Sequence, residues 1–360
     1  MPPSIEGATD ASSLEANLRR LALPPREVRA AGLRALMGEA DPRVRQLALG
    51  VRRTAHRHFD LHVVPLVQQH WPEVLGDPFF DKLSIGACDL YASAPYTALF
   101  CAPKGPLVLR AVASAGDLLP LPAPALSLLG RGAIEAWGRL AMPDVHRRIA
   151  LVAAFIVVVD HVFDHGMDDP PRARGARLEA VIEGQTPPDG PALALTRALR
   201  VAMAERLDGD DRAAFEAAMA QVFGWIRAEV RAMLGEPDPR GLGHRMAGVE
   251  GTIDGLLFPV LKHTGSGPRA WMIDVSLFVQ IMDDWLDAEA DARSNRPTPV
   301  IEGRWTQADV EEAWARTVTG IEALARAAGH RSPRYQRFIR DAYVLMMREV
   351  AEAMIARPDA

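Results

Sequence analysis

The chain has 360 residues, of which 49% are hydrophobic, and its formal net charge at pH 7 is −5. This length suits one large domain or two ordinary ones, and the charge balance excludes the concentrated basic surface of a nucleic-acid-binding protein. The two cysteines, Cys88 and Cys101, support neither a disulfide framework nor a zinc site, and they suit a reducing compartment.

The N-terminal region and the apolar segments bear on membrane association. The first 20 residues lack the charged-then-apolar layout of a signal peptide. The longest apolar run, residues 149–159, has eleven residues and ends at Asp160, which is too short to cross a bilayer. We therefore expect a cytoplasmic protein that does not span a membrane.

Helical periodicity dominates the chain, strand signals are weak, and Ala, Leu, Arg, Glu and Met are abundant, so we predict an all-α fold. Residues 1–140 form an N-terminal helical region whose membership of the same bundle is left open. Its expected segments are helices at 13–36, with a break at Pro24-Pro25, and at 42–69, irregular chain at 71–107, and a linker at 118–124.

Residues 141–360 are expected to form a second, more regular helical domain. Loops are predicted at 184–191 and 235–243. The expected helices are 146–167, 193–207, 210–234, 245–263, 271–292, 307–328 and 332–356.

Two segments of this second domain carry the same spacing of carboxylates, D-xxx-D-xxx-D. The first acidic row is Asp160, Asp164 and Asp168, and the second acidic row is Asp283, Asp287 and Asp291. A step of four residues leaves an angular offset of only ~40° around an α-helix, so each row is predicted to line one helix face. Two such faces opposite one another would repel unless cations lay between them.

The surroundings of the rows distinguish them from ordinary solvated helix faces. The first row follows the apolar run 149–159, and the second follows SLFVQIM at 276–282. Acidic groups in apolar helices are costly unless they bind something, and Asp is a poor helix former. Ligand sets made only of carboxylates favour Mg²⁺ over zinc. His161 and His165, beside the first row, are expected to pack or form hydrogen bonds locally.

Magnesium held by a few carboxylates usually also binds substrate phosphates. Several Mg²⁺ ions bridging a diphosphate would stabilise it as a leaving group, and an apolar cavity would shield the resulting carbocation from water. Basic side chains near the two rows would complete such a diphosphate site. The candidates are Arg245, Lys262, Arg293 and Arg296.

These motifs resemble those of the class I isoprenoid synthases, most of all the squalene/phytoene synthase branch. The stretch 160–164, DHVFD, is similar to the family's D-D-x-x-D motif, and 283–293, DDWLDAEADAR, resembles N-x-x-x-D-x-x-x-D-A-R. A glycine-rich stretch at 250–255 precedes the second motif, as in that branch. The second motif is also similar to N-D-x-x-S-x-x-x-E of terpene cyclases, and 280–287 resembles Q-x-x-D-D-x-x-D of polyprenyl diphosphate synthases. The resemblance covers about residues 145–300.

The resemblance implies a helical bundle of the isoprenoid synthase type, with a central apolar cavity and Mg²⁺ held from two walls. The implied metal ligands are Asp160 and Asp164 on one wall and Asp283, Asp287 and Asp291 on the other. The implied substrate-binding residues are Gln280, Arg245, Lys262, Arg293 and Arg296. Asp168 is expected to lie too far towards the mouth of the cavity to bind metal. The candidates for lining the cavity, with plain core packing as the alternative for each, are Phe155, Phe163, Phe258 and Trp285.

Departures from the family motifs bear on the reaction. His161 replaces the second Asp of the first motif, Asp283 replaces Asn, and Arg296-Pro-Thr-Pro replaces Arg-Ile-Tyr-Leu-Pro. The Gly-Gly-Lys-Arg motif for isopentenyl diphosphate is absent from the sequence. Because these losses affect a co-substrate site, the resemblance implies a terpene synthase that ionises and cyclises one prenyl diphosphate and releases diphosphate.

Two alternatives stay open. One is prenyl transfer, by head-to-head coupling or to an acceptor, and the other is a non-catalytic helical protein that binds prenyl diphosphates. The expected partner is a prenyl diphosphate and not a nucleic acid, and a homodimer is one option for the oligomeric state.

Overall fold

The protein is described by a computed structural model. The described residues are 11–88, 122–141, 144–207, 209–234, 236, 250, 253, 266–293, 298–327 and 333–356. The regular structure within these ranges is helical and contains no strand, which confirms the predicted all-α class. In the same ranges, every helix is too short or too polar to cross a membrane.

The N-terminal half of the described chain contains more helix than expected. The predicted break at Pro24-Pro25 separates α1 from α2, and the segment 42–69 forms two helices. The expectation of irregular chain after residue 70 is wrong for η1 and for a helical stretch at 78–88, whereas 89–107 lie outside the described residues. The elements of this half are α1 (Ala11–Leu21), α2 (Arg26–Met37), α3 (Pro42–His62), α4 (Val64–His70), η1 (Pro72–Gly76) and α7 (Ala123–Ala141).

The C-terminal half follows the sequence prediction closely where it is described. The helix α9 is additional, and the predicted helix 271–292 begins at Ser266 and is interrupted at Asp287. The predicted loop 235–243 and helix 245–263 lie outside the described residues, except for 236, 250 and 253. The elements are α8 (Val145–His165), α9 (Pro171–Glu183), α10 (Pro191–Ala204), α11 (Gly209–Met233), α14 (Ser266–Leu286), α15 (Ala288–Arg293), α16 (Gln307–Ala327) and α17 (Pro333–Ile355).

Local signals explain where several helices begin and end. The carboxylate of Asp41 accepts a hydrogen bond from the Arg43 N–H at 2.8 Å, and Pro42 occupies the first turn of α3, where its missing N–H costs nothing. At the end of α9, Gly184 has φ = +79°, the left-handed conformation that terminates many helices. These caps are short-range features, which is why the sequence predicted most boundaries within a few residues.

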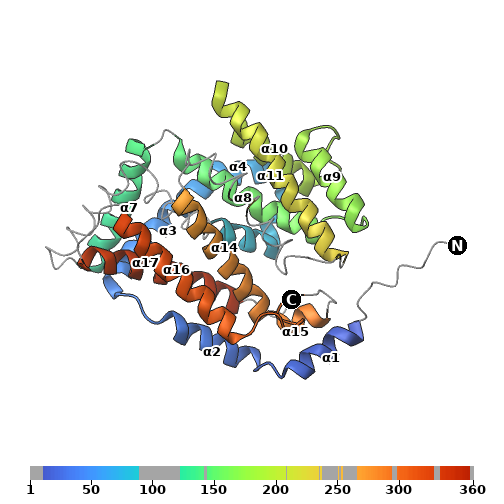
Figure 1. Ribbon diagram of the computed structural model, residues 1–360. Coiled ribbons are helices and arrows are strands. Elements are labelled where there is room, and N and C mark those ends of the chain that lie inside the picture. The colour runs from blue at the N-terminus through green and yellow to red at the C-terminus, as the bar shows by residue number, and fades with distance from the viewer. Residues whose placement is uncertain are drawn as a thin grey trace.

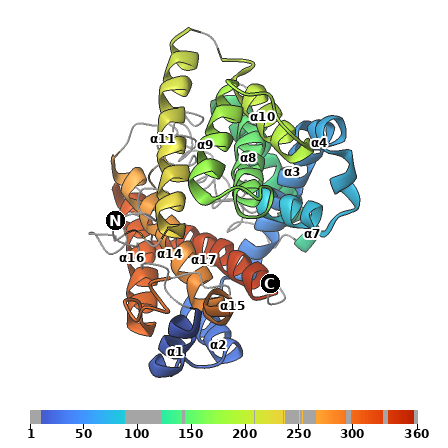
Figure 2. The ribbon, with the colours of Figure 1, turned by 90° about the vertical axis from the view of Figure 1, so that its right-hand side faces the viewer.

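The helices pack in two groups that are joined by α3. One group contains α4, α8, α9 and α10, and the other contains α2, α14, α16 and α17 (Figures 1 and 2). The helix α3 packs against α7 and α8 and also against α17. A single large core cluster extends from Ala30 to Met354, so N-terminal and C-terminal helices bury their apolar faces against one another.

Candidate functional site

The first acidic row lies at the C-terminal end of α8. The apolar residues before it, Ile149 to Phe155, are buried, as the sequence predicted. Asp160 is exposed and Asp164 is half-buried one turn later. The helix ends at His165 rather than at residue 167, so Asp168 lies in the following loop. The prediction that three carboxylates share one helix face is therefore wrong for Asp168, and the helical row has two members.

His161 occupies the place where the family motif has a second carboxylate, and it packs as the sequence analysis expected. Its ring stacks on Phe79, with 3.6 Å between ring centroids, and lies 5.3 Å from the ring of His165. Burial, followed by the charges of His165 and Lys82, lowers the pKa of His161 to about 4. The imidazole is consequently neutral at pH 7 and engaged with an aromatic neighbour.

The second acidic row crosses the junction between α14 and α15. Asp283 belongs to α14, Asp287 stands at the bend, and Asp291 belongs to α15; all three are half-buried. The backbone keeps the helical spacing through the bend, because the N–H of Asp287 donates to the Asp283 carbonyl and that of Asp291 to the Asp287 carbonyl, both at 2.9 Å. The row thus keeps its four-residue steps although the predicted continuous helix is wrong.

A buried arginine from α2 holds this junction. The guanidinium of Arg29 donates to the carbonyl oxygens of Trp285 at 2.6 Å and Leu286 at 3.1 Å, at the C-terminal end of α14. It also forms a bidentate pair with the carboxylate of Glu289. Burial acts to raise the pKa of Glu289, but the hydrogen bond and charge of Arg29 outweigh it, so the pKa is lowered. Arg29 therefore satisfies helix-end carbonyls and a carboxylate together.

A second arginine of α2 contacts the row directly. A guanidinium nitrogen of Arg26 lies 3.7 Å from a carboxylate oxygen of Asp287, and the same side chain donates to the Met354 and Ile355 carbonyls at 3.2 Å. The side chain of Asp287 is 36% exposed, so this ion pair is open to solvent and weak. The N-terminal helix α2 is thus part of the surroundings of the second row, which the sequence did not indicate.

The two helices that carry the rows have a similar orientation in the fold. The helices α8 and α14 run in the same general direction, and their C-terminal ends lie towards the same side of the molecule, the right-hand side of Figure 1, which faces the viewer in Figure 2. Among the described residues, the group of potential metal ligands within 4.8 Å of one another is His58, Glu135 and His146, and it includes no member of either row.

The remaining predicted site residues are distributed as follows. Gln280 is half-buried on α14 and Arg293 is exposed at the end of α15, whereas Arg245, Lys262 and Arg296 lie outside the described residues. The proposed lining residues Phe155, Phe163 and Trp285 are at most 5% exposed and belong to the main core cluster, and Phe258 lies outside the described residues.

Two arginines near the first row were missed by the sequence analysis. Arg174 donates to the Phe163 carbonyl at 2.8 Å, at the C-terminal end of α8, and Arg177 pairs with Asp169 at 2.8 Å. Both belong to α9, which begins at Pro171. A proline in the first helical turn is a known start signal, so the Pro170-Pro171 pair could have indicated this helix.

The arrangement offers two sets of carboxylates at the ends of buried helices, with arginines beside each. Oxygen ligands that keep some exposure suit Mg²⁺, which retains part of its water shell in proteins. Comparisons of the chain with protein-family models, with curated proteins and with solved structures gave no match.

Proposed function

We propose that this protein is a Mg²⁺-dependent class I isoprenoid synthase that ionises an allylic prenyl diphosphate, cyclises it and releases diphosphate. The observation that supports the proposal best is the position of the two acidic rows. The rows lie at the C-terminal ends of α8 and α14, and in the ribbon of Figure 1 these two helix ends lie towards the same side of the molecule. Paired rows of this kind suit a metal-bridged diphosphate between two helices.

Each group of residues has a distinct role in this proposal. Asp160 and Asp164 hold metal from α8, and Asp283, Asp287 and Asp291 hold it from the α14–α15 junction. When bound, Mg²⁺ neutralises charge on the departing diphosphate. The exposed Arg293 follows the second row and is one of the cations that contact the diphosphate oxygens in this proposal. The apolar helices exclude water from the carbocation.

Product analysis tests the proposal. The protein is incubated with Mg²⁺ and geranyl, farnesyl or geranylgeranyl diphosphate, each alone and together with isopentenyl diphosphate, and both hydrocarbons and released diphosphate are measured. A cyclic product from a single substrate supports cyclisation. Longer or coupled products would indicate prenyl transfer instead of cyclisation. If no substrate releases diphosphate, the proposal of an enzyme is rejected and the binding-protein alternative remains.

Variants of the rows test the metal assignment. Asp164→Asn and Asp283→Asn are each expected to lower turnover about 100-fold or more, since a lost ligand weakens charge stabilisation worth several kcal/mol. Asp168→Asn is the matched control, because Asp168 lies beyond the end of α8, and its turnover should stay within about threefold of the wild type. Equal losses in all three variants would contradict the two-wall assignment.

A further inference from the structure

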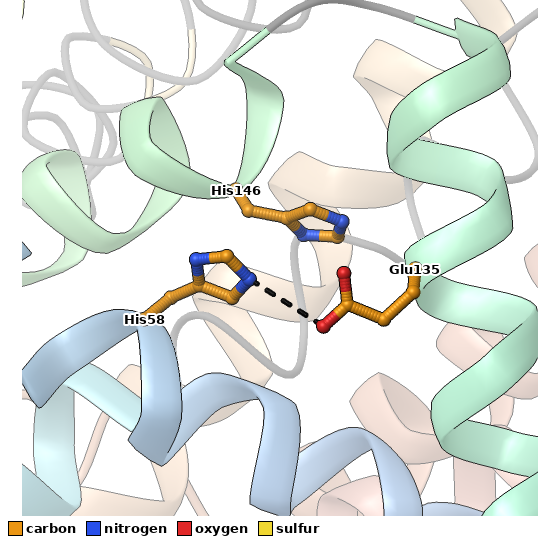
Figure 3. Close-up of side chains that lie close together, drawn as sticks. All are labelled: His58, Glu135 and His146. Carbon is orange, nitrogen blue, oxygen red and sulfur yellow. Dashed lines mark ion pairs between the residues drawn. The ribbon is translucent and has the colours of Figure 1, made fainter. Parts of the chain in front are cut away.

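Three side chains from three different helices converge at a place away from the acidic rows. His58 comes from α3, Glu135 from α7 and His146 from α8, and one ligand atom of each lies within 4.8 Å of the others (Figure 3). His146 stands at the N-terminal end of α8, about 14 residues and ~21 Å along the helix from Asp160. This group is therefore separate from the diphosphate site proposed above.

The group is compact and largely shielded from solvent. The Nε2 atom of His58 lies 3.7 Å from a carboxylate oxygen of Glu135. The rings of His58 and His146 are stacked, with 4.6 Å between centroids and an interplanar angle of 18°. His146 is 9% exposed, and the side chains of His58 and Glu135 are 13% and 23% exposed. A metal ion here would meet three donors that already lie close together, with little competing water.

We propose that His58, Glu135 and His146 form a binding site for a divalent transition-metal ion of the Zn²⁺ class. Two imidazoles and one carboxylate are ligands that Zn²⁺ prefers, and imidazole donors disfavour Mg²⁺. Zinc–nitrogen and zinc–oxygen distances of about 2.0–2.2 Å require ligand atoms roughly 3.3 Å apart. An imidazole nitrogen binds a metal in the plane of its ring, so the nearly parallel rings of His58 and His146 must turn towards a common point while the donors move inward by about 1 Å.

Two neighbours shape this site without belonging to it. A guanidinium nitrogen of Arg57 lies 3.3 Å from the Glu135 carboxylate, and the side chain is 61% exposed. Arg57 thus competes with a metal ion for that carboxylate, and it can swing into solvent. The ring of His62, one turn later on α3, also stacks with that of His58, with 5.6 Å between centroids, and His62 is outside the ligand group.

The sequence prediction of no zinc site rested on the shortage of cysteines, and this proposal revises it. Glu135 and His146 are 11 residues apart on consecutive helices, but His58 lies 77 residues before Glu135, so the packing of α3 against α7 and α8 brings the three ligands together. A bound ion would connect the three helices and leave a coordination position for water, since three protein ligands do not complete a tetrahedral zinc site.

Titration with Co²⁺ tests the proposal, because the visible absorption of Co²⁺ changes with the ligands that bind it. Untagged full-length protein is stripped with EDTA, dialysed and titrated. We expect saturable absorption at one equivalent, displaced by Zn²⁺ but not by Mg²⁺. His58→Gln and His146→Gln should each weaken Co²⁺ binding about 100-fold or more. Zn²⁺ should also raise the unfolding temperature of the wild type and not of these variants.

Matched variants make the result decisive. Arg57→Gln and His62→Gln leave all three ligands in place. The Co²⁺ affinity of each variant should be no lower than about one third of the wild-type affinity. Asp164→Asn should bind it normally, which separates this site from the acidic rows. If His146→Gln does not fold, as judged by circular dichroism, Glu135→Gln replaces it. No saturable absorption in the wild type, or equal binding in His58→Gln, would overturn the proposal.

Discussion

Arg29 has a side chain with no exposed surface, although arginine is among the residues least often buried. Its charge is compensated by Glu289, and its remaining donors meet the Pro24, Trp285 and Leu286 carbonyls. A buried charge of this kind is tolerated only when it is paired and hydrogen-bonded. The position of the second acidic row therefore depends on a residue of α2.

We predict that Arg29→Met lowers the free energy of unfolding by about 3–5 kcal/mol, because it leaves the helix-end carbonyls and Glu289 without their donor. Glu289→Gln should also destabilise the protein, because it leaves the buried guanidinium uncompensated. Denaturant unfolding of both single variants and the double variant measures the coupling. If the free energy lost in the double variant equals the sum of the losses in the two single variants, Arg29 and Glu289 do not act as a pair.

The sequence identified neither residue as special. Arg29 occupies an ordinary place in an amphipathic helix, and its partner lies 260 residues away. The same limitation applies to His161, whose stacking on Phe79 depends on how α8 meets the stretch 78–88. Residue types and spacings gave candidate ligand-binding groups, but the partner of each group is a property of long-range packing.

Two glycines allow α3 and α7 to approach closely. A Cβ atom added at Gly50 would lie 2.1 Å from the Ser127 carbonyl oxygen, and one at Gly130 would lie 2.2 Å from the Leu47 carbonyl oxygen. Backbones can only approach to this extent where side chains are absent. Because His58 follows Gly50 on α3 and Glu135 follows Gly130 on α7, this close contact also sets the geometry of the proposed transition-metal site.

We predict that Gly130→Ala destabilises the protein by about 1–3 kcal/mol or more, because the added methyl group pushes the two helices apart. It should also weaken Co²⁺ binding. Gly132→Ala is the control within the same helix, since nothing lies within 4 Å of its added Cβ. This control should be neutral or stabilising by up to about 1 kcal/mol, from the better helix propensity of alanine. Thermal unfolding and Co²⁺ titration compare the two variants, and equal destabilisation would contradict the close-approach explanation.

Prediction of individual elements succeeded where local signals are strong. The helices α10, α11, α16 and α17 follow their predicted ranges because amphipathic periodicity and end signals lie within the segment itself. The bend at Asp287 was missed, since the periodicity continues through it and the clamp comes from α2. The helix α9 was not predicted, although it begins with a proline in its first turn.

The molecule as a whole has a core that the N-terminal and C-terminal regions share. Leu33, Phe59 and Val63, all at most 3% exposed, belong to the same buried cluster as Phe278 and Tyr343. The helix α2 packs against α14 and α17, and α3 packs against α8 and α17. Separating the two regions would expose these apolar surfaces on both of them. The free-energy cost is roughly 25 cal/mol for each Å² of apolar surface exposed to water.

We therefore predict that residues 141–360 alone do not fold cooperatively. The expected result is a fragment without a sharp thermal transition by circular dichroism and with strong binding of a hydrophobic dye, because the faces that α2 and α3 cover are exposed. The full-length chain under the same conditions is the reference. A fragment that melts cooperatively near the temperature of the full chain would mean that the shared core contributes little.

Several properties of this protein follow from short-range features of its sequence. The all-α class, most helix limits, the buried character of the α8 run and the two rows of carboxylates all arise from periodicity, capping and residue chemistry within single segments. The contacts that those residues make with other segments were decided only by the tertiary structure. The bend at Asp287, the Arg29 clamp and the convergence of His58, Glu135 and His146 depend on which helices meet. Packing joins residues that are distant along the chain, and no local pattern encodes that proximity.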